Sequence, residues 1–159
     1  MSSREACTAS PSVTSKAIAS APIRAAASRN EARSRPLMTT WAPCPASALA
    51  VSRLLAQRTA GVTIANVNQI DRPDNLAMVR LLKVPLSPYA SIDLSRFTRT
   101  VMVDSQPDHA QCLAGLKPDV VIDHHPDSGY RGRFTDVRPA YGATATILTE
   151  YLRAARITP

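Results

Sequence analysis

The chain has 159 residues and a formal net charge of +7, with 19 Lys or Arg against 12 Asp or Glu. This length allows one modest domain, or a smaller domain with a tail. No apolar run is long enough for a membrane-spanning helix, and the polar first ten residues exclude a secretory signal peptide. Three scattered cysteines (Cys7, Cys44, Cys112) predict free thiols in a reducing compartment, so we expect a cytoplasmic protein without a membrane partner.

Residues 1–38 are rich in Ala, Ser and Arg, and their apolar content is mostly Ala. Such a segment buries too little area to offset its ordering entropy, which predicts a disordered tail. Residues 1–40 carry +4 of the net charge, so the charge alone predicts only weak, salt-sensitive attraction to a polyanion. An organellar transit peptide and a later start at Met38 are alternative interpretations of the segment.

Residues 39–159 contain the patterned part of the chain. Apolar side chains recur at helical spacing over about 46–58, and VTIANV (62–67) predicts a strand after Gly61. Residues 71–82 begin with Asp and Pro and predict a second helix, followed by a loop with two prolines. The segment before the first helix, ASRNEARSRPLM, has no strand pattern, so we expect no strand there.

Two short apolar runs, TVMVD (100–104) and PDVVID (118–123), predict buried strands separated by a short helix or turn over 107–116. RFTDV (133–137) predicts a third strand at an edge. Residues 142–155 predict an amphipathic helix with four inward side chains, Ala145, Leu148, Leu152 and Ala155. Alternating helices and apolar strands predict an α/β fold: a Rossmann-like, mostly parallel sheet with helices on both faces.

Candidate chemistry lies where two apolar strands end. Asp104 and Asp123 close these strands, and His124 and His125 follow directly. Ligands bind at the carboxyl ends of strands in open parallel sheets. Carboxylates with imidazole suit Mn²⁺ or Mg²⁺, ions that support phosphoryl hydrolysis. Each residue alone has a simpler interpretation, a turn residue for Asp or a structural role for His; their conjunction favours a metal site.

The start of the last predicted helix is a candidate phosphate site. Gly142 and Thr144 lie where unpaired helix amides favour an anion, although ordinary capping explains them equally well. Arg138 is a candidate phosphate ligand, whereas Arg131 and Arg133 are expected to be solvated surface residues.

Several stretches resemble the DHH family of phosphoesterases, and specifically its exopolyphosphatase-related, nano-RNase-like branch. These are DNLAMVRLLKVPLSP (74–88), VMVDSQPDHAQ (101–111), PDVVIDHHPD (118–127) and RPAYGATATILTEYL (138–152). The resemblance covers roughly residues 40–155. It implies hydrolysis of phosphodiester or phosphoanhydride bonds in nucleotides, short oligonucleotides or polyphosphate, with Mn²⁺ or Mg²⁺ as cofactor.

The same resemblance assigns a role to each residue of the Asp-His-His motif. Asp104 and His124 would be metal ligands, with Asp104 between two ions. His125 would contact the scissile phosphate, and Asp123 would orient the histidine pair. No specific protein partner follows from the sequence.

The chain departs from the family pattern at the first motif, approximately H-x-N-P-D-x-D-A. Alignment on Pro43 places Thr40, Cys44 and Ala46 at its ligand positions. We therefore expect residues 39–159 to be a partial DHH domain without the C-terminal substrate-binding domain, able to hold one ion. The alternatives are a catalytically inactive binding module and a truncated gene product.

Overall fold

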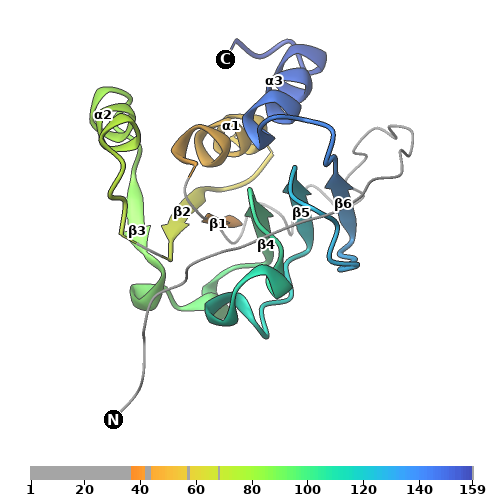
Figure 1. The fold of residues 1–159 in the computed structure, drawn as a ribbon. Helices are drawn as coiled ribbons and strands as arrows, with labels where there is room; N and C mark the ends of the chain where they lie inside the picture. Colours follow the sequence, from red (N-terminus) through yellow and green to blue (C-terminus); the bar gives the residue numbers. More distant parts are fainter. Residues whose placement is uncertain (1–36, 42–43, 57, 68, 159) are drawn as a thin grey trace.

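The computed structural model describes residues 37–41, 44–56, 58–67 and 69–158 (Figure 1). Its strands and α-helices follow in chain order: β1 (Leu37–Trp41), α1 (Pro45–Leu55), β2 (Val62–Asn66), α2 (Pro73–Leu81), β3 (Leu86–Pro88), β4 (Arg99–Val103), β5 (Val120–Asp123), β6 (Phe134–Val137) and α3 (Thr144–Ala154). Four single-turn 3₁₀ helices lie between them: η1 (Tyr89–Ser91), η2 (Leu94–Arg96), η3 (Pro107–His109) and η4 (Gln111–Leu113).

The six strands form one sheet in the order β3-β2-β1-β4-β5-β6, and every neighbouring pair is parallel. The predicted α/β class with a parallel sheet is therefore confirmed. All strands end at the same edge, and the chain progresses outward in opposite directions from the central pair β1 and β4. The loops that follow these two strands leave the sheet toward different neighbours, which opens space for a ligand at this edge.

β1 is a strand that the sequence pattern does not reveal. It pairs with β2 and with β4, Leu37 lying opposite both Val62 and Arg99, so the expected absence of a strand before the first helix is wrong. Backbone hydrogen bonds on both sides stabilise a central strand whatever its side-chain pattern. β1 thus begins at Leu37, inside the predicted tail; residues 1–36 of that tail lie outside the described residues.

The two faces of the sheet are covered differently. Figure 1 shows α1, α2 and α3 together on one face, where Val101 and Val103 of β4 belong to a core shared with α1 and α3. Met102, between them, packs with Leu113 of η4 on the other face. We expected helices on both faces, but this second face is covered by the 3₁₀ helices η3 and η4. The connection over residues 107–116 is too short to contain an α-helix between two strands.

Most predicted elements lie within a few residues of those observed, with two exceptions. β3 forms where a proline loop was expected, because edge strand pairing to β2 tolerates Pro. In α3, Leu148 and Leu152 are buried as predicted, but Ala155 is exposed because the helix ends at Ala154.

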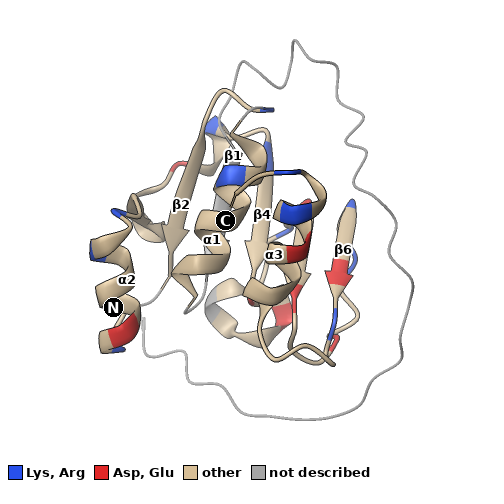
Figure 2. Ribbon diagram, turned by 90° about the horizontal axis from the view of Figure 1, so that it is seen from above, with Lys and Arg blue, Asp and Glu red and all other residues tan. Residues whose placement is uncertain are grey.

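No helix within the described ranges is long and apolar enough to cross a membrane. Figure 2 shows the Lys and Arg positions of these ranges distributed over several elements, with acidic positions on β6 and α3 among them.

Candidate metal centre

The carboxyl end of β4 presents Asp104 in an uncommon backbone conformation. Its φ of 60° lies in the left-handed region, and its N–H donates to the carbonyl oxygen of Ile122 at 3.0 Å. This conformation costs about 1–2 kcal/mol for most L-residues, and Asp tolerates it better than most. Asp104 is also buried, with 8% of its surface exposed. A buried carboxylate on an unusual backbone marks a candidate functional position.

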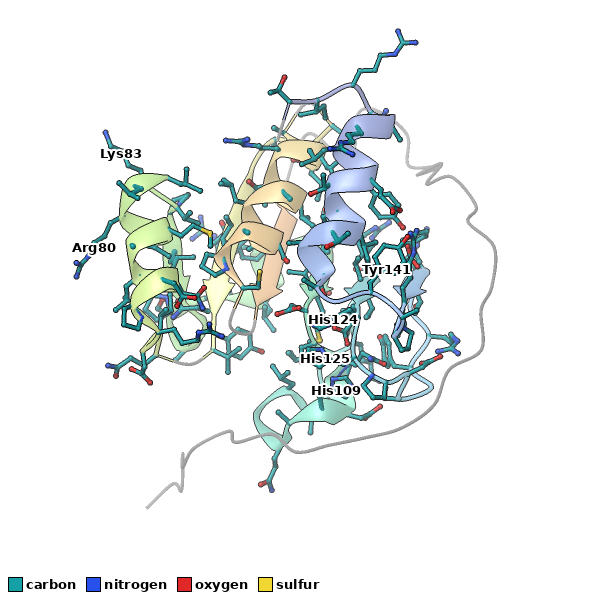
Figure 3. All side chains as sticks on the ribbon, turned by 45° about the horizontal axis from the view of Figure 1, so that its top comes forward. Arg80, Lys83, His109, His124, His125 and Tyr141 are labelled. Atoms are coloured by element: carbon teal, nitrogen blue, oxygen red, sulfur yellow. The ribbon has the colours of Figure 1, made fainter. Side chains whose placement is uncertain are left out.

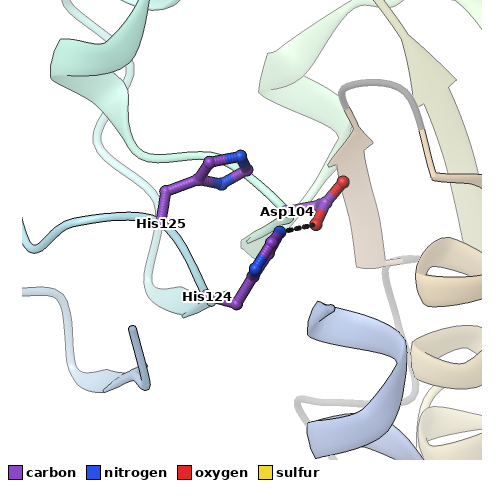
Figure 4. Close-up of side chains that lie close together, drawn as sticks. All are labelled: Asp104, His124 and His125. Carbon is purple, nitrogen blue, oxygen red and sulfur yellow. Dashed lines mark ion pairs between the residues drawn. The ribbon is translucent and has the colours of Figure 1, made fainter. Parts of the chain in front are cut away.

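His124, directly after β5, faces Asp104 across a gap (Figure 4). Its Nε2 lies 3.5 Å from Asp104 Oδ1, longer than a normal hydrogen bond. Two ligand atoms on one divalent ion are separated by roughly 3.0–3.4 Å, given ~2.1 Å bonds and octahedral to tetrahedral angles. The gap is therefore close to the separation that a shared ion requires.

The hydrogen bond made by the other ring nitrogen of His124 determines which nitrogen carries the proton. Nδ1 lies 3.1 Å from the carbonyl oxygen of Tyr141, which can only accept, so Nδ1 donates. In the neutral ring Nε2 then carries a lone pair directed at the carboxylate of Asp104. Two acceptors facing each other are unfavourable unless a proton or a metal ion lies between them. A backbone carbonyl that orients an imidazole is also the usual support of a metal-ligating histidine.

His125 is held by Asp123, whose side chain is fully buried. Nδ1 of His125 and the backbone N–H of His124 both donate to Asp123 Oδ1 at 2.8 Å. The hydrogen bond to Asp123 raises the pKa of His125 above its usual value, although burial opposes this. The ring is 43% exposed, so its other edge is available to a ligand and favours an anionic one.

Gln106 is a site residue that the sequence analysis missed. It is fully buried, and its Nε2 donates to Asp123 Oδ2 at 2.7 Å and to the Pro126 carbonyl oxygen at 3.0 Å. Its Oε1 accepts from the Ser128 N–H at 2.8 Å. Burial raises the pKa of Asp123, but the hydrogen bonds from His125 and Gln106 outweigh it, so the pKa lies below its usual value.

His109, in η3, is the second residue that was missed. Figure 3 shows the three histidines of the chain in one group, in which the ring of His125 contacts those of His109 and His124. Nδ1 of His109 lies 3.8 Å from Asp123 Oδ2, and its ring meets that of His125 edge to face. The only signal for both residues was their position, within five residues after Asp104.

Two three-residue groups at this edge offer ligand atoms within 4.8 Å of one another. One consists of Asp104, His124 and His125, and the other of His109, Asp123 and His125. Each provides two imidazoles and one carboxylate, a donor set that suits Zn²⁺ and related transition metals as well as Mn²⁺.

The three predicted phosphate ligands lie in different surroundings. Thr144 begins α3 behind Ala143, which offers no side-chain cap, and its buried hydroxyl has no partner within the described ranges. Gly142 is exposed. Arg138 is not directed at the histidines; its guanidinium contacts Asp136 and Glu150, each at 2.7 Å, and the Tyr141 ring at 5.3 Å. Two acidic neighbours thus hold the cation on β6 and α3.

The positions that align with the family's first motif extend from the end of β1 to the first turn of α1. Thr40 is in β1, but its side chain falls outside the described residues. Cys44 precedes α1 and accepts a hydrogen bond from Ser47 Oγ at 3.2 Å, and Ala46 follows in the first turn. This turn contains no acidic residue.

The chain was compared with known proteins. It is 33% identical over 114 residues to an uncharacterized protein of Methanocaldococcus jannaschii. The alignment covers 72% of this chain and 24% of that protein, so the chain spans about a quarter of the length of the relative. A scan against models of protein families finds no match.

Proposed function

We propose that this chain is a Rossmann-like DHH-type domain that hydrolyses phosphodiester or phosphoanhydride bonds with a divalent ion, Mn²⁺ or Mg²⁺, as cofactor. Its substrates are nucleotides, short oligonucleotides or polyphosphate. The observation that carries the proposal is the 3.5 Å gap between His124 Nε2 and Asp104 Oδ1, two acceptors that one cation would satisfy.

The fold supports this proposal by its strand order. A parallel sheet in the order 3-2-1-4-5-6 is the arrangement of doubly wound nucleotide-binding folds, whose ligands lie at the carboxyl edge beside the central strands. Asp104 and His124 occupy that edge, at the ends of β4 and β5. A shared fold does not by itself assign a function, so the chemistry of the proposal comes from the Asp104 and His124 donors.

Each residue would have a distinct task. Asp104 and His124 would hold the ion, with Tyr141 O keeping the imidazole of His124 in the required tautomer. An ion held by Asp104 and His124 would supply charge stabilisation for phosphoryl oxygens and a lowered pKa of bound water. His125, with a pKa raised by Asp123, would donate from its exposed edge to a phosphoryl oxygen.

The N-terminus of α3 supports an anionic substrate beside this centre. The Thr146 amide donates to the Ala143 carbonyl oxygen at 3.1 Å, whereas the amides of Thr144 and Ala145 have no intrahelical acceptor. Tyr141, whose carbonyl holds His124, lies only three residues before Thr144. The exposed Gly142 between them leaves room for a phosphate. The negative charge would therefore lie between the helix end and His125.

A second candidate is a binding module without turnover. It is favoured by the first turn of α1, which lacks the carboxylates expected of the family's first motif. Losing several ligands of a two-ion site removes most activity, because such residues act as a unit. This candidate would bind a nucleotide with a divalent ion but leave it intact.

Hydrolysis by the full chain tests the proposal. A short oligonucleotide, a polyphosphate and a nitrophenyl phosphodiester are incubated with Mn²⁺, with EDTA, and with the Asp104→Asn and His124→Ala variants. We expect Mn²⁺-dependent turnover that both variants and EDTA abolish. Folded protein that binds but does not cleave would replace the proposal by the binding module. A non-cooperative thermal melt would favour the truncated product instead.

A further inference from the structure

His109 has no role in the proposed hydrolysis, yet its surroundings repeat those of His124. Its Nε2 lies 3.3 Å from the carbonyl oxygen of Pro126, which can only accept, so Nε2 donates. In the neutral ring Nδ1 then carries the lone pair, and it faces Asp123 Oδ2 at 3.8 Å. This distance is too long for a hydrogen bond and only a few tenths of an ångström above the separation of two ligands on one ion.

The third donor of this group is His125. Its Nδ1 lies 2.8 Å from Asp123 Oδ1, and its ring centroid lies 5.6 Å from that of His109 at an interplanar angle of 81°. His125 contacts Oδ1 of Asp123 and His109 faces Oδ2, and one ligand atom from each of the three residues lies within 4.8 Å of the others. An ion here would take the place of the hydrogen that joins His125 to Asp123.

The two segments that provide these donors are already tied together. Gln106 precedes η3 and binds the Asp123 carboxylate, the Pro126 carbonyl and the Ser128 amide, so it joins the turn of His109 to the end of β5. A buried polar anchor of this kind orients ligands before the ion arrives. The group is therefore pre-organised and not an accidental meeting of surface side chains.

We propose that His109, Asp123 and His125 form a second metal position beside the Asp104–His124 pair, selective for a transition metal such as Zn²⁺ or Co²⁺ over Mg²⁺. Two imidazoles and one carboxylate are the donor set of open zinc sites, whereas Mg²⁺ prefers oxygen ligands and retains its waters. This position does not depend on the proposed hydrolysis, because it rests on the geometry of His109, Asp123 and His125 and not on any turnover.

The test uses the full chain, reduced and metal-free, titrated with Zn²⁺ by calorimetry and by ¹⁵N NMR of the histidine rings. The chain has three histidines, so every ring can be followed. We expect two ions in the wild type and one in His109→Gln, with the His109 Nδ1 signal moving in the wild type. Asp108→Asn, which changes the exposed neighbour by one charge, controls for electrostatics and should retain both ions.

Two ions in His109→Gln would overturn the proposal, as would a His109 ring that does not respond in the wild type. The NMR result needs no variant, so it stands even if a substitution disturbs folding. Hydrolysis that fails while two Zn²⁺ ions bind would refute the proposed function and leave the second position intact. Hydrolysis by a wild type that binds only one Zn²⁺ ion would support the proposed function and refute the second metal position.

Discussion

Gln106 offers the sharpest test of how the candidate site is held, because it is fully buried and makes three hydrogen bonds there. Gln106→Leu keeps the approximate size of the side chain and removes all three. The bond to the Asp123 carboxylate is worth ~1.5–3 kcal/mol, and the bonds to Pro126 and Ser128 about 0.5–1.5 kcal/mol each. We therefore expect the free energy of unfolding to fall by roughly 3–5 kcal/mol.

Urea unfolding of the metal-free chain measures this loss. With a slope near ~2 kcal/mol per molar urea, the midpoint should fall by about 1.5–2.5 M at unchanged slope. Gln111→Leu is the matched control, because Gln111 is an exposed glutamine in η4, where such a change costs within about 0.5 kcal/mol. If the two variants unfold at the same urea concentration, Gln106 does not hold Asp123 as described.

Three further outcomes follow from single positions. Gly132→Ala should lower the free energy of unfolding by about 1–3 kcal/mol, because its Cβ would lie 2.7 Å from a backbone carbonyl oxygen, whereas Gly142→Ala, with nothing within 4 Å, should be near neutral in the same thermal melts. Asp104→Ala should unfold more easily than Asp104→Asn by about 1 kcal/mol, since Asn tolerates φ near 60°; equal urea midpoints would contradict this. The raised pKa of His125 stabilises the metal-free fold fully below pH ~6.5, the pKa of an unfolded histidine, and this contribution is lost as the pH rises through the folded pKa. His125→Asn should remove that part of the pH dependence of the urea midpoint, and an unchanged profile would exclude the pair with Asp123 as its source.

The meeting of Asp104 with His124 could be predicted from sequence, because strand-end residues of a parallel sheet share one edge. Gln106 and His109 could not, since turn residues give no periodic signal and their partners lie 14 or more positions away. Contact of Arg138 with substrate phosphate stays a prediction, and its acidic partners on β6 and α3 were not predicted from spacing.

The helices and strands were also predictable from the sequence only in part. Apolar periodicity predicted α1, β2, β4 and β5 to within a few residues. β1 was missed because backbone pairing on both sides stabilises a central strand, and the side chains of LMTTW show no strand pattern. The sequence analysis did not predict that the α-helices cover one face of the sheet. This arrangement depends on which connections between strands are long enough to contain an α-helix.

Binding of Mn²⁺ to the full chain, followed by the loss of the free-ion electron paramagnetic resonance signal, tests the metal centre most directly. The wild type and Gln111→Leu should bind the same number of Mn²⁺ ions, and Asp104→Asn and His124→Ala should each lose, or bind much more weakly, the ion at this centre. Equal Mn²⁺ binding by all four proteins would contradict a metal centre at Asp104 and His124, and with it the proposed hydrolysis.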